Sequence, residues 1–251
     1  MNKAIGSIAR GVMPNPLYRW FRGASSGEDE TPSVGSVDFG SLRRLTPISR
    51  VFGFDRGTPV DRYYIENFLA RNASDIRGTV LEAGDDSYTR RLGDERVTRS
   101  EVLHVVEGNP QATIVADLAA GENIPSDTFD CIILTQTLQF IYDLKSAILT
   151  LHRILRPGGV LLATMPGISQ IDHNEWHDSW YWSFTKLSAS RLFAGVFSPD
   201  SVEIEAHGNV FAAIAFLQGI ALEELRVGEL DNADPDYQLI ITVRASKESA
   251  V

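Results

Sequence analysis

The residues best suited to acid–base chemistry lie in one segment, residues 166–185, with the sequence PGISQIDHNEWHDSWYWSFT. A histidine with a carboxylate beside it can take a proton from a hydroxyl group. His177, which is followed directly by Asp178, is therefore the predicted general base, and His173 is the alternative. Aromatic side chains of the same segment could pack on the apolar faces of sugar rings; they are Trp176, Trp180, Tyr181 and Trp182.

The same segment allows other interpretations. His173 and His177 with an acid could hold a divalent cation that orients a hydroxyl acceptor. We do not favour a metal site, because spacing within a loop says little about coordination geometry. Each histidine alone could have a structural role, and the tryptophans could form a lid that packs on the domain. We expect the segment to set substrate selectivity, as loops at the ligand-binding edge of a sheet commonly do.

A second group of residues is typical of a ligand-binding turn. The sequence TVLEAGDDSYTRRLG, residues 79–93, begins as an apolar strand and reaches a glycine, Gly84, where a nucleotide-binding turn requires one. Polar residues at 85–87 then stand where more glycines are expected. We interpret this stretch as a remodelled turn, in which Asp86 caps a short helix predicted over 87–93 or binds a ligand's ammonium group.

These residues must be positioned by the surrounding elements, which alternate between short β-branched runs and longer segments of helical period. Strands are expected at 79–83, 101–106, 112–116, 130–135, 160–165, 201–206 and 237–245. Helices are expected at 60–72, 143–155, 186–197 and 210–225, with Thr58 as the N-cap of the first and Pro59 in its first turn. The alternation predicts an α/β fold with a doubly wound, mainly parallel seven-stranded sheet that binds ligands at the carboxyl ends of its strands.

The domain organisation follows from composition. Residues 23–40 are rich in glycine, serine and acid, so residues 1–40 are expected to form a basic, aromatic-bearing tail with a flexible acidic linker. Residues 41–251 form the predicted domain, because a chain of 251 residues with 43% hydrophobic content can bury a sizeable core. Glycines and prolines interrupt any signal-peptide core in the tail, and no apolar stretch is long enough for a membrane span.

Charge and cysteine content limit the partners and the compartment. The 23 basic and 33 acidic residues give a net charge of −10, which repels nucleic acid and favours a small-molecule or glycan partner. Cys131 is the single cysteine and lies in an apolar run, so we expect a buried thiol and no disulfide within the chain. A cytoplasmic location is the corresponding expectation.

Five short stretches follow one another in an informative order. They are Val80–Gly84, Glu107, Asp117–Leu118, FDCIILTQTLQFI and ILRPGGVLLATMPG. This ordered set resembles the class I S-adenosylmethionine-dependent methyltransferases. Further stretches are similar to a bacterial branch that methylates glycans and other hydroxyl compounds; they are FGFDRGTPVDRYYIENFL, TLQFIYD, WSFT and DPDYQLIITVRA. The resemblance implies a Rossmann-like sheet with an antiparallel last strand, and S-adenosylmethionine as the cofactor.

The resemblance also implies roles for individual residues. Gly84 lets the backbone approach the cofactor closely, Glu107 accepts hydrogen bonds from the ribose hydroxyls, and Asp117 accepts one from the adenine amino group. Arg56 could bind the cofactor carboxylate through a two-pronged contact, or belong to a surface turn. The other residues expected at the cofactor are Glu82, Asp86, Gly108, Asn109, Leu118 and Thr135.

Two departures from the family pattern concern the cofactor site. The cofactor has no pyrophosphate, so the turn after Gly84 does not need every glycine of a dinucleotide-binding loop. Only GNPQATIVA separates Glu107 from Asp117, which is too short for the helix that normally connects these strands. The adenine pocket should therefore be shallow and open. The rival interpretation is a decayed site in a non-catalytic module that binds a partner enzyme.

The predicted function is transfer of a methyl group from S-adenosylmethionine to a hydroxyl, on a sugar or glycan. Such a transfer depends mainly on aligning the nucleophile with the carbon–sulfur bond, and His177 would take the hydroxyl proton. The helix expected at 210–225 is apolar almost all round. It should lie buried in the core or cover the sheet, with a homodimer interface as the alternative.

Overall fold

The computed structural model describes residues 31–172, 176 and 178–249. The chain divides into two compact units, Met1–Arg44 and Leu45–Val251. Within residues 31–44 the regular structure is a single 3₁₀ turn, η2 (Gly40–Leu42), and these residues are exposed. Among the described residues, the helices and strands that could position a site belong to the second unit.

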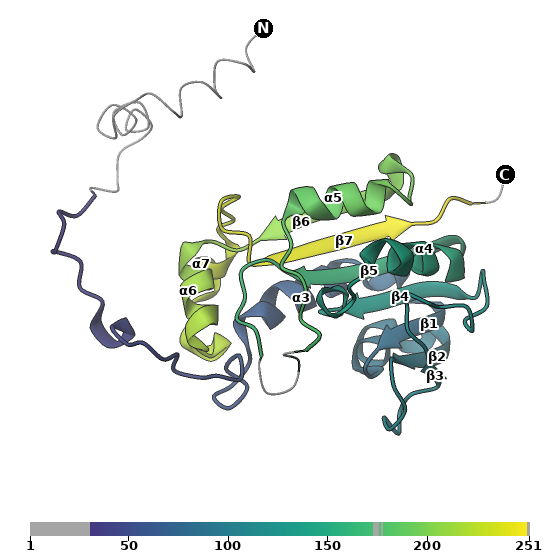
Figure 1. Cartoon of the computed structure of the whole chain (residues 1–251), viewed down its shortest axis with the longest axis horizontal. Coiled ribbons are helices and arrows are strands. Elements are labelled where there is room, and N and C mark those ends of the chain that lie inside the picture. Colours follow the sequence, from purple (N-terminus) through teal and green to yellow (C-terminus); the bar gives the residue numbers. More distant parts are fainter. Residues whose placement is uncertain (1–30, 173–175, 177, 250–251) are drawn as a thin grey trace, which may run out of the picture. The chain divides into compact units, whose positions relative to one another are not determined.

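The second unit is built on a seven-stranded sheet with the order β3-β2-β1-β4-β5-β7-β6. Its strands are β1 (Gly78–Ala83), β2 (Val97–His104), β3 (Ile114–Val115), β4 (Phe129–Thr135), β5 (Leu155–Pro166), β6 (Val202–His207) and β7 (Ile240–Ser246). β7 runs antiparallel to both of its neighbours, and the other pairs are parallel. The predicted fold, a mainly parallel sheet with an antiparallel last strand, is confirmed (Figure 1).

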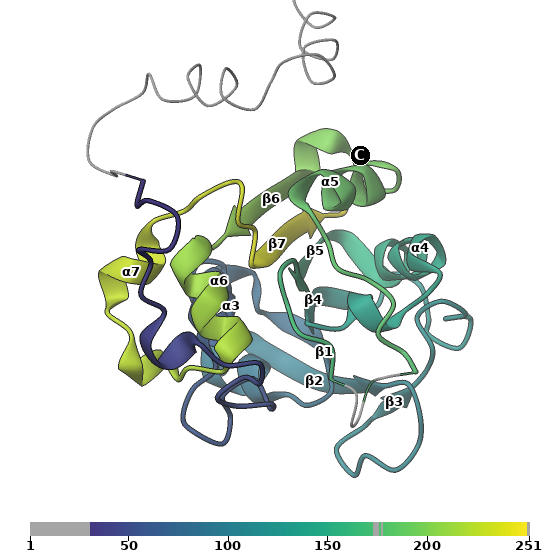
Figure 2. The same ribbon diagram turned by 60° about the vertical axis from the view of Figure 1, so that its left-hand side comes forward.

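Helices cover both faces of the sheet (Figure 2). They are α3 (Val60–Arg71), α4 (Leu144–Ile154), α5 (Lys186–Ala194), α6 (Val210–Gln218) and α7 (Val227–Asp231). α4 and α5 enclose one apolar core, which includes Ile132 and Phe193, whereas α3 and α6 enclose a second core with Ile133 and Phe216. Neighbouring residues of β4 thus point to opposite cores, so both faces of the strand are buried and its central residues 131–134 form a continuous apolar run.

The helix predicted over 210–225 is wrong in its length, and it takes one of the two positions expected for it, over the sheet. α6 ends at Gln218 because Gly219 adopts the left-handed φ of 65°, where a Cβ would meet Ser49. One face of α6 packs on the sheet, but the opposite face is 39–46% exposed at Val210, Phe211, Ile214 and Leu217. The helix therefore covers the sheet rather than lying wholly within the core. A dimer through its exposed face stays a prediction.

The second strand also differs from the prediction at its end. β2 ends at His104 instead of residue 106, and the His104 ring then bonds the Val106 carbonyl oxygen at 2.8 Å. Val105 and Val106 are 59% and 58% exposed, because β3 is only two residues long and offers no further ladder. The connection from β2 to β3 contains no helix, as its length predicted.

Two expectations from composition can be compared with the structure. The Cys131 thiol is fully buried in β4, as predicted, and burial raises its pKa above the usual range. Within the described ranges, no helix has the length and apolar character needed to cross a bilayer.

Candidate functional site

Two adjoining cavities open where β1 and β4 end, at the point where the strand order reverses. Their volumes are about 550 Å³ and 600 Å³. Ala83 and Thr135 line both, so the two cavities meet at the carboxyl ends of β1 and β4. The polar cavity takes its character from Arg62, Glu66, Glu82, Asp85, Tyr88 and Arg91. The apolar cavity is lined by Gly84, Leu103, Ala116, Leu118, Ile141 and aromatic rings.

The apolar cavity brings together four of the predicted cofactor residues, which are Gly84, Asp117, Leu118 and Thr135. Asp117 lies at its exposed rim, where its Oδ1 accepts the Ala119 N–H at 2.8 Å. This bond fixes the orientation of the carboxylate. Leu118 is buried and supplies an apolar wall beside it.

Gly84 makes the turn between the two cavities. Its φ is 91°, which a residue with a side chain rarely adopts, and no atom lies within 4 Å of the place a Cβ would take. Asn109 Nδ2 donates to the Gly84 carbonyl oxygen at 2.6 Å, and the Gly84 N–H donates to Leu103. The turn is therefore held from behind by β2 and its loop, with open space at Gly84.

In the remodelled turn, Glu82 caps the short helix, which is the role expected of Asp86. The buried Glu82 carboxylate accepts the Tyr88 N–H at 3.1 Å, and the Thr89 N–H and hydroxyl at 2.7 Å each. Burial raises the pKa of Glu82, and these hydrogen bonds oppose the rise. Asp86 instead pairs with Arg90 at 2.8 Å and lines neither cavity. The helix predicted over 87–93 is present, with a π-helical turn at Thr89–Gly93.

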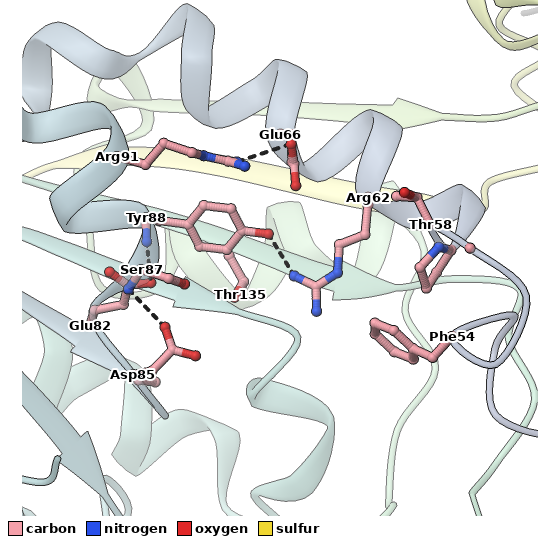
Figure 3. A pocket seen from close by; sticks show the side chains of 13 residues that line it. Phe54, Thr58, Arg62, Glu66, Glu82, Asp85, Ser87, Tyr88, Arg91 and Thr135 are labelled. Atoms are coloured by element: carbon pink, nitrogen blue, oxygen red, sulfur yellow. Dashed lines mark hydrogen bonds and ion pairs between the residues drawn. The ribbon is translucent and has the colours of Figure 1, made fainter. Parts of the chain in front are cut away.

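The polar cavity holds a guanidinium that the sequence did not predict (Figure 3). Arg62 of α3 donates to the Tyr88 hydroxyl at 2.6 Å, and its guanidinium lies 5.7 Å from the centroid of the Phe54 ring. Arg91 pairs with Glu66 at 3.0 Å on the same wall. Burial raises the pKa of the Tyr88 phenol, so the hydroxyl stays neutral and accepts from Arg62.

Five predicted residues are not brought to either cavity: Arg56, Asp86, Glu107, Gly108 and Asn109. The Arg56 guanidinium pairs with Glu224 at 2.6 Å. Glu107 lies in an exposed turn three residues after the end of β2, rather than at the end of the strand. The contacts proposed for these residues with the cofactor stay predictions.

Thr58, the predicted N-cap of the first helix, instead forms hydrogen bonds to another turn. Pro59, not Thr58, is the N-cap of α3. The Thr58 hydroxyl donates to the Glu223 carboxylate at 2.6 Å, and its N–H donates to the same group at 3.0 Å. These hydrogen bonds hold the loop before α3 against the 3₁₀ turn Leu222–Glu224.

The predicted acceptor segment lies partly outside the described residues, which exclude His173 and His177. Asp178 is described and is exposed in a turn. The Tyr181 N–H donates to the Gln139 carbonyl at 2.9 Å, which anchors the segment beside the end of β4. The apolar cavity is lined by two of the segment's aromatic side chains, Trp176 and Tyr181. No group of three metal-ligating side chains is found in the part of the chain that the structure describes.

A family comparison agrees with this geometry. Residues 86–163, which run from the turn after β1 into β5, match the model of a methyltransferase domain. The second unit, Leu45–Val251, therefore contains a segment similar to a methyltransferase domain.

Solved structures similar to the methyltransferase domain are distant in sequence. A SAM-dependent methyltransferase from Archaeoglobus fulgidus is 12% identical with a TM-score of 0.51, and the match covers 79% of this chain and 100% of that one. A Haemonchus contortus phosphoethanolamine N-methyltransferase bound to phosphomonomethylethanolamine and S-adenosylhomocysteine is 14% identical with a TM-score of 0.50, covering 76% of this chain and 54% of that one. The [4+2]-cyclase SpnF is 15% identical with a TM-score of 0.50, over 75% and 81% of the two chains.

These identities show a shared fold, and the cyclase among them illustrates that one fold carries different reactions. No curated protein matches the sequence. The acceptor of the methyltransferase domain must therefore be argued from its own residues.

Proposed function

We propose that the methyltransferase domain transfers the methyl group of S-adenosylmethionine to a hydroxyl group of a sugar or glycan. The proposed cofactor site is supported by two adjoining cavities, one apolar and one charged, at the point where the strand order of the sheet reverses. Adenosine has a flat, largely apolar base, whereas the methionine end carries an ammonium and a carboxylate. The two cavities match these two ends in chemistry.

The adenosine end fits the apolar cavity. Leu118 and Ile141 offer apolar walls, and Asp117 at the rim is able to accept a hydrogen bond from the adenine amino group. Since no helix covers the loop between β2 and β3, this side of the cavity is open. The expected shallow adenine pocket accords with that opening.

The methionine end fits the polar cavity. Arg62 can hold a carboxylate with charge-assisted hydrogen bonds, the role predicted for Arg56, while Asp85 lies on the same cavity for an ammonium. When bound, the cofactor supplies an electrophilic methyl group on a sulfonium. The chain's own contribution is to fix the orientation of the cofactor between Gly84 and Arg62, because alignment is the main requirement of the transfer.

Arg62→Ala is expected to weaken the binding of S-adenosylmethionine by about 1.5–3 kcal/mol, the range for hydrogen bonds to a charged group. Isothermal titration calorimetry measures this change. The matched control is Arg56→Ala, whose guanidinium pairs with Glu224 outside the cavities and whose loss should leave the affinity within about twofold. The opposite ranking of the two variants would return the carboxylate contact to Arg56.

Support for a sugar acceptor comes from aromatic side chains that remain open to solvent beside the apolar cavity. Tyr142, Tyr181 and Trp182 are 72%, 49% and 36% exposed. Tyr142 stacks on Trp182 at 5.9 Å and meets Tyr181 edge-on at 5.4 Å, so the three rings form one preorganised surface. Such rings suit the apolar faces of sugars, and the net charge of −10 disfavours nucleic acid as the occupant.

The test of the function is release of S-adenosylhomocysteine in the presence of methyl glycosides of glucose, galactose, mannose and rhamnose. A hydroxyl-methylating enzyme should release it only with such acceptors, and mass spectrometry should find the methyl ether. Release with amines alone would overturn the hydroxyl assignment. Binding of the cofactor without release from any acceptor would favour the non-catalytic module.

The general base is proposed to be His177 with Asp178, and His173 is the alternative. A base contributes typically 10²- to 10⁴-fold, so His177→Ala should lower turnover on that scale and leave cofactor affinity nearly unchanged. Turnover with a methylated glycoside and calorimetry with S-adenosylmethionine measure the two quantities separately. Near-normal turnover in both His177→Ala and His173→Ala would leave catalysis to alignment, or to a base outside the segment.

A further inference from the structure

Two buried polar atoms beside the acceptor segment lack a hydrogen-bond partner within the described part of the chain. They are Gln139 Oε1 and Trp180 Nε1. Neither atom is accessible to solvent, and Gln139 as a whole is only 1% exposed. Folded proteins pair nearly all buried polar groups, because an unpaired one destabilises the native state. Gln139 Oε1 is an unpaired acceptor, and Trp180 Nε1 is an unpaired donor.

The backbone brings the two side chains to adjacent segments. The N–H of Tyr181, which follows Trp180, donates to the Gln139 carbonyl at 2.9 Å. The Trp180 ring meets the Phe140 ring edge-on, with a centroid distance of 5.3 Å. The Gln139 amide nitrogen already donates to the Gln136 carbonyl at 2.9 Å. The unused end of the Gln139 amide is therefore its oxygen.

Strained backbone supports both side chains. Four non-glycine residues of the described ranges have positive φ, and two of them are aspartates, which tolerate it. The other two are Phe52 at 58° and Gln136 at 46°. Phe52 stacks on Trp180 with ring planes 11° apart, and Gln136 holds the Gln139 amide. Backbone strain of this kind persists where function requires a fixed geometry.

The pair lies next to the proposed reaction site. Gln136 directly follows Thr135, which lines both cavities, and Gln136 and Phe140 themselves line the apolar cavity. Gln136 Nε2 also donates to Thr164 Oγ1 on β5 at 3.3 Å. Gln139 and Trp180 line neither cavity themselves, but each contacts a residue of the apolar cavity's wall, Gln136 and Phe140 respectively.

We propose that Gln139 and Trp180 bind one neutral hydroxyl group of the acceptor, which donates to Gln139 Oε1 and accepts from Trp180 Nε1. This proposal rests on the proposed function and names residues that select its acceptor. A hydroxyl donates and accepts at once, whereas an ammonium cannot accept and a carboxylate cannot donate. Since both atoms are closed to solvent, Trp180 must shift for the acceptor to enter, and the bound hydroxyl is then shielded from water.

Trp180→Phe is the sharpest test, because it removes the indole N–H and keeps an aromatic ring to stack on Phe52. The KM for the methyl glycoside that is methylated should rise about tenfold, the equivalent of one hydrogen bond. The Kd for S-adenosylmethionine should not change. The urea midpoint of unfolding should fall only by the cost of the smaller ring, because no hydrogen bond is lost.

Trp182→Phe is the matched control. The Trp182 indole N–H is paired, since it donates to the Ile141 carbonyl at 3.0 Å. Removing it loses a hydrogen bond as well as ring volume, so Trp182→Phe should lower the urea midpoint more than Trp180→Phe does. Gln139→Met, which removes the amide, should raise the same KM as Trp180→Phe does, and the double variant should add little further change.

Each outcome decides the proposal. A urea midpoint that falls as far in Trp180→Phe as in Trp182→Phe, or further, would show that the indole N–H has a structural partner, such as an internal water, and would overturn the proposal. An unchanged KM in Trp180→Phe, with methylation intact in the unmodified chain, would overturn the hydroxyl contact alone. If the unmodified chain methylates none of the glycosides, the proposed function fails and the acceptor contact fails with it.

Discussion

Gly84→Val is expected to lose at least about a hundredfold of its affinity for S-adenosylmethionine, or about 3 kcal/mol. The space at Gly84 is open for 4 Å around the place of a Cβ, and this space faces the cavity proposed for the cofactor. A branched side chain would fill it and would also strain a backbone held at φ 91°. Isothermal titration calorimetry with S-adenosylmethionine measures the loss, after circular dichroism has shown that the variant is folded.

Gly108→Val separates blocking of the cavity from strain. Gly108 has φ 115° and also has no atom within 4 Å of a Cβ position, but it lines neither cavity. Its backbone strain should match that of Gly84→Val while the cavities stay open, so its affinity for the cofactor should be nearly normal. Normal binding by Gly84→Val would show that the cofactor lies elsewhere. Equal losses in both variants would assign the effect to strain.

The sheet was predictable because most of its strands are buried on both faces. The run at 131–134 is apolar throughout, and β4 occupies Phe129–Thr135. A strand end depends instead on whether a neighbour extends the ladder, and the sequence does not show that. β2 therefore ends at His104, although two valines follow, because β3 pairs with Leu103 and His104 alone.

The helix over 210–225 failed for a related reason. Its apolar pattern continues beyond Gln218, but a single glycine, Gly219, takes the left-handed conformation against Ser49 and ends the helix. Apolar periodicity does not reveal whether a glycine continues a helix or caps it. The tertiary contact decides between the two.

Most of the predicted cofactor residues that line a cavity lie at the end of a strand or just after it. Gly84, Asp117 and Thr135 come just after strands or at their ends, and parallel strands bring such positions to one edge. Arg62 and Tyr88 lie 26 residues apart and meet only because α3 packs over the turn after β1. No local pattern encodes that contact.

Which acid caps the short helix after β1 could not be predicted from the sequence. Glu82 and Asp86 both precede the short helix, and either could cap it by residue type. Glu82 is on β1 and is 2% exposed, so its carboxylate has to be satisfied by the helix N–H groups. Asp86 has Arg90 one turn away as its partner. Burial, which the sequence gives only indirectly, selected the cap.

Asp61→Asn is expected to stabilise the chain at neutral pH and to have little effect in acid. Burial raises the pKa of Asp61 to about 6 from an ordinary 3.8, despite the opposing charge of Arg62. Its Oδ1 is buried and lacks a hydrogen-bond partner among the described residues. The folded state therefore binds the proton of Asp61 more tightly than the unfolded state does. The resulting contribution to stability is fully present below pH 3.8 and is lost as the pH rises through about 6.

At pH 7 the ionised carboxylate should cost about 2–3 kcal/mol, which follows from a shift of about two pKa units. Asparagine keeps the shape without the charge, so Asp61→Asn should raise the free energy of unfolding by that amount at pH 7 and by close to zero near pH 4. Urea unfolding at both values measures the difference. The control is Asp200→Asn in an exposed turn, which should change the free energy by less than about 0.5 kcal/mol at either pH. Equal stability of Asp61→Asn and the unmodified chain at pH 7 would mean that water or a polar group stabilises the ionised Asp61. The buried carboxylate would then not destabilise the folded state.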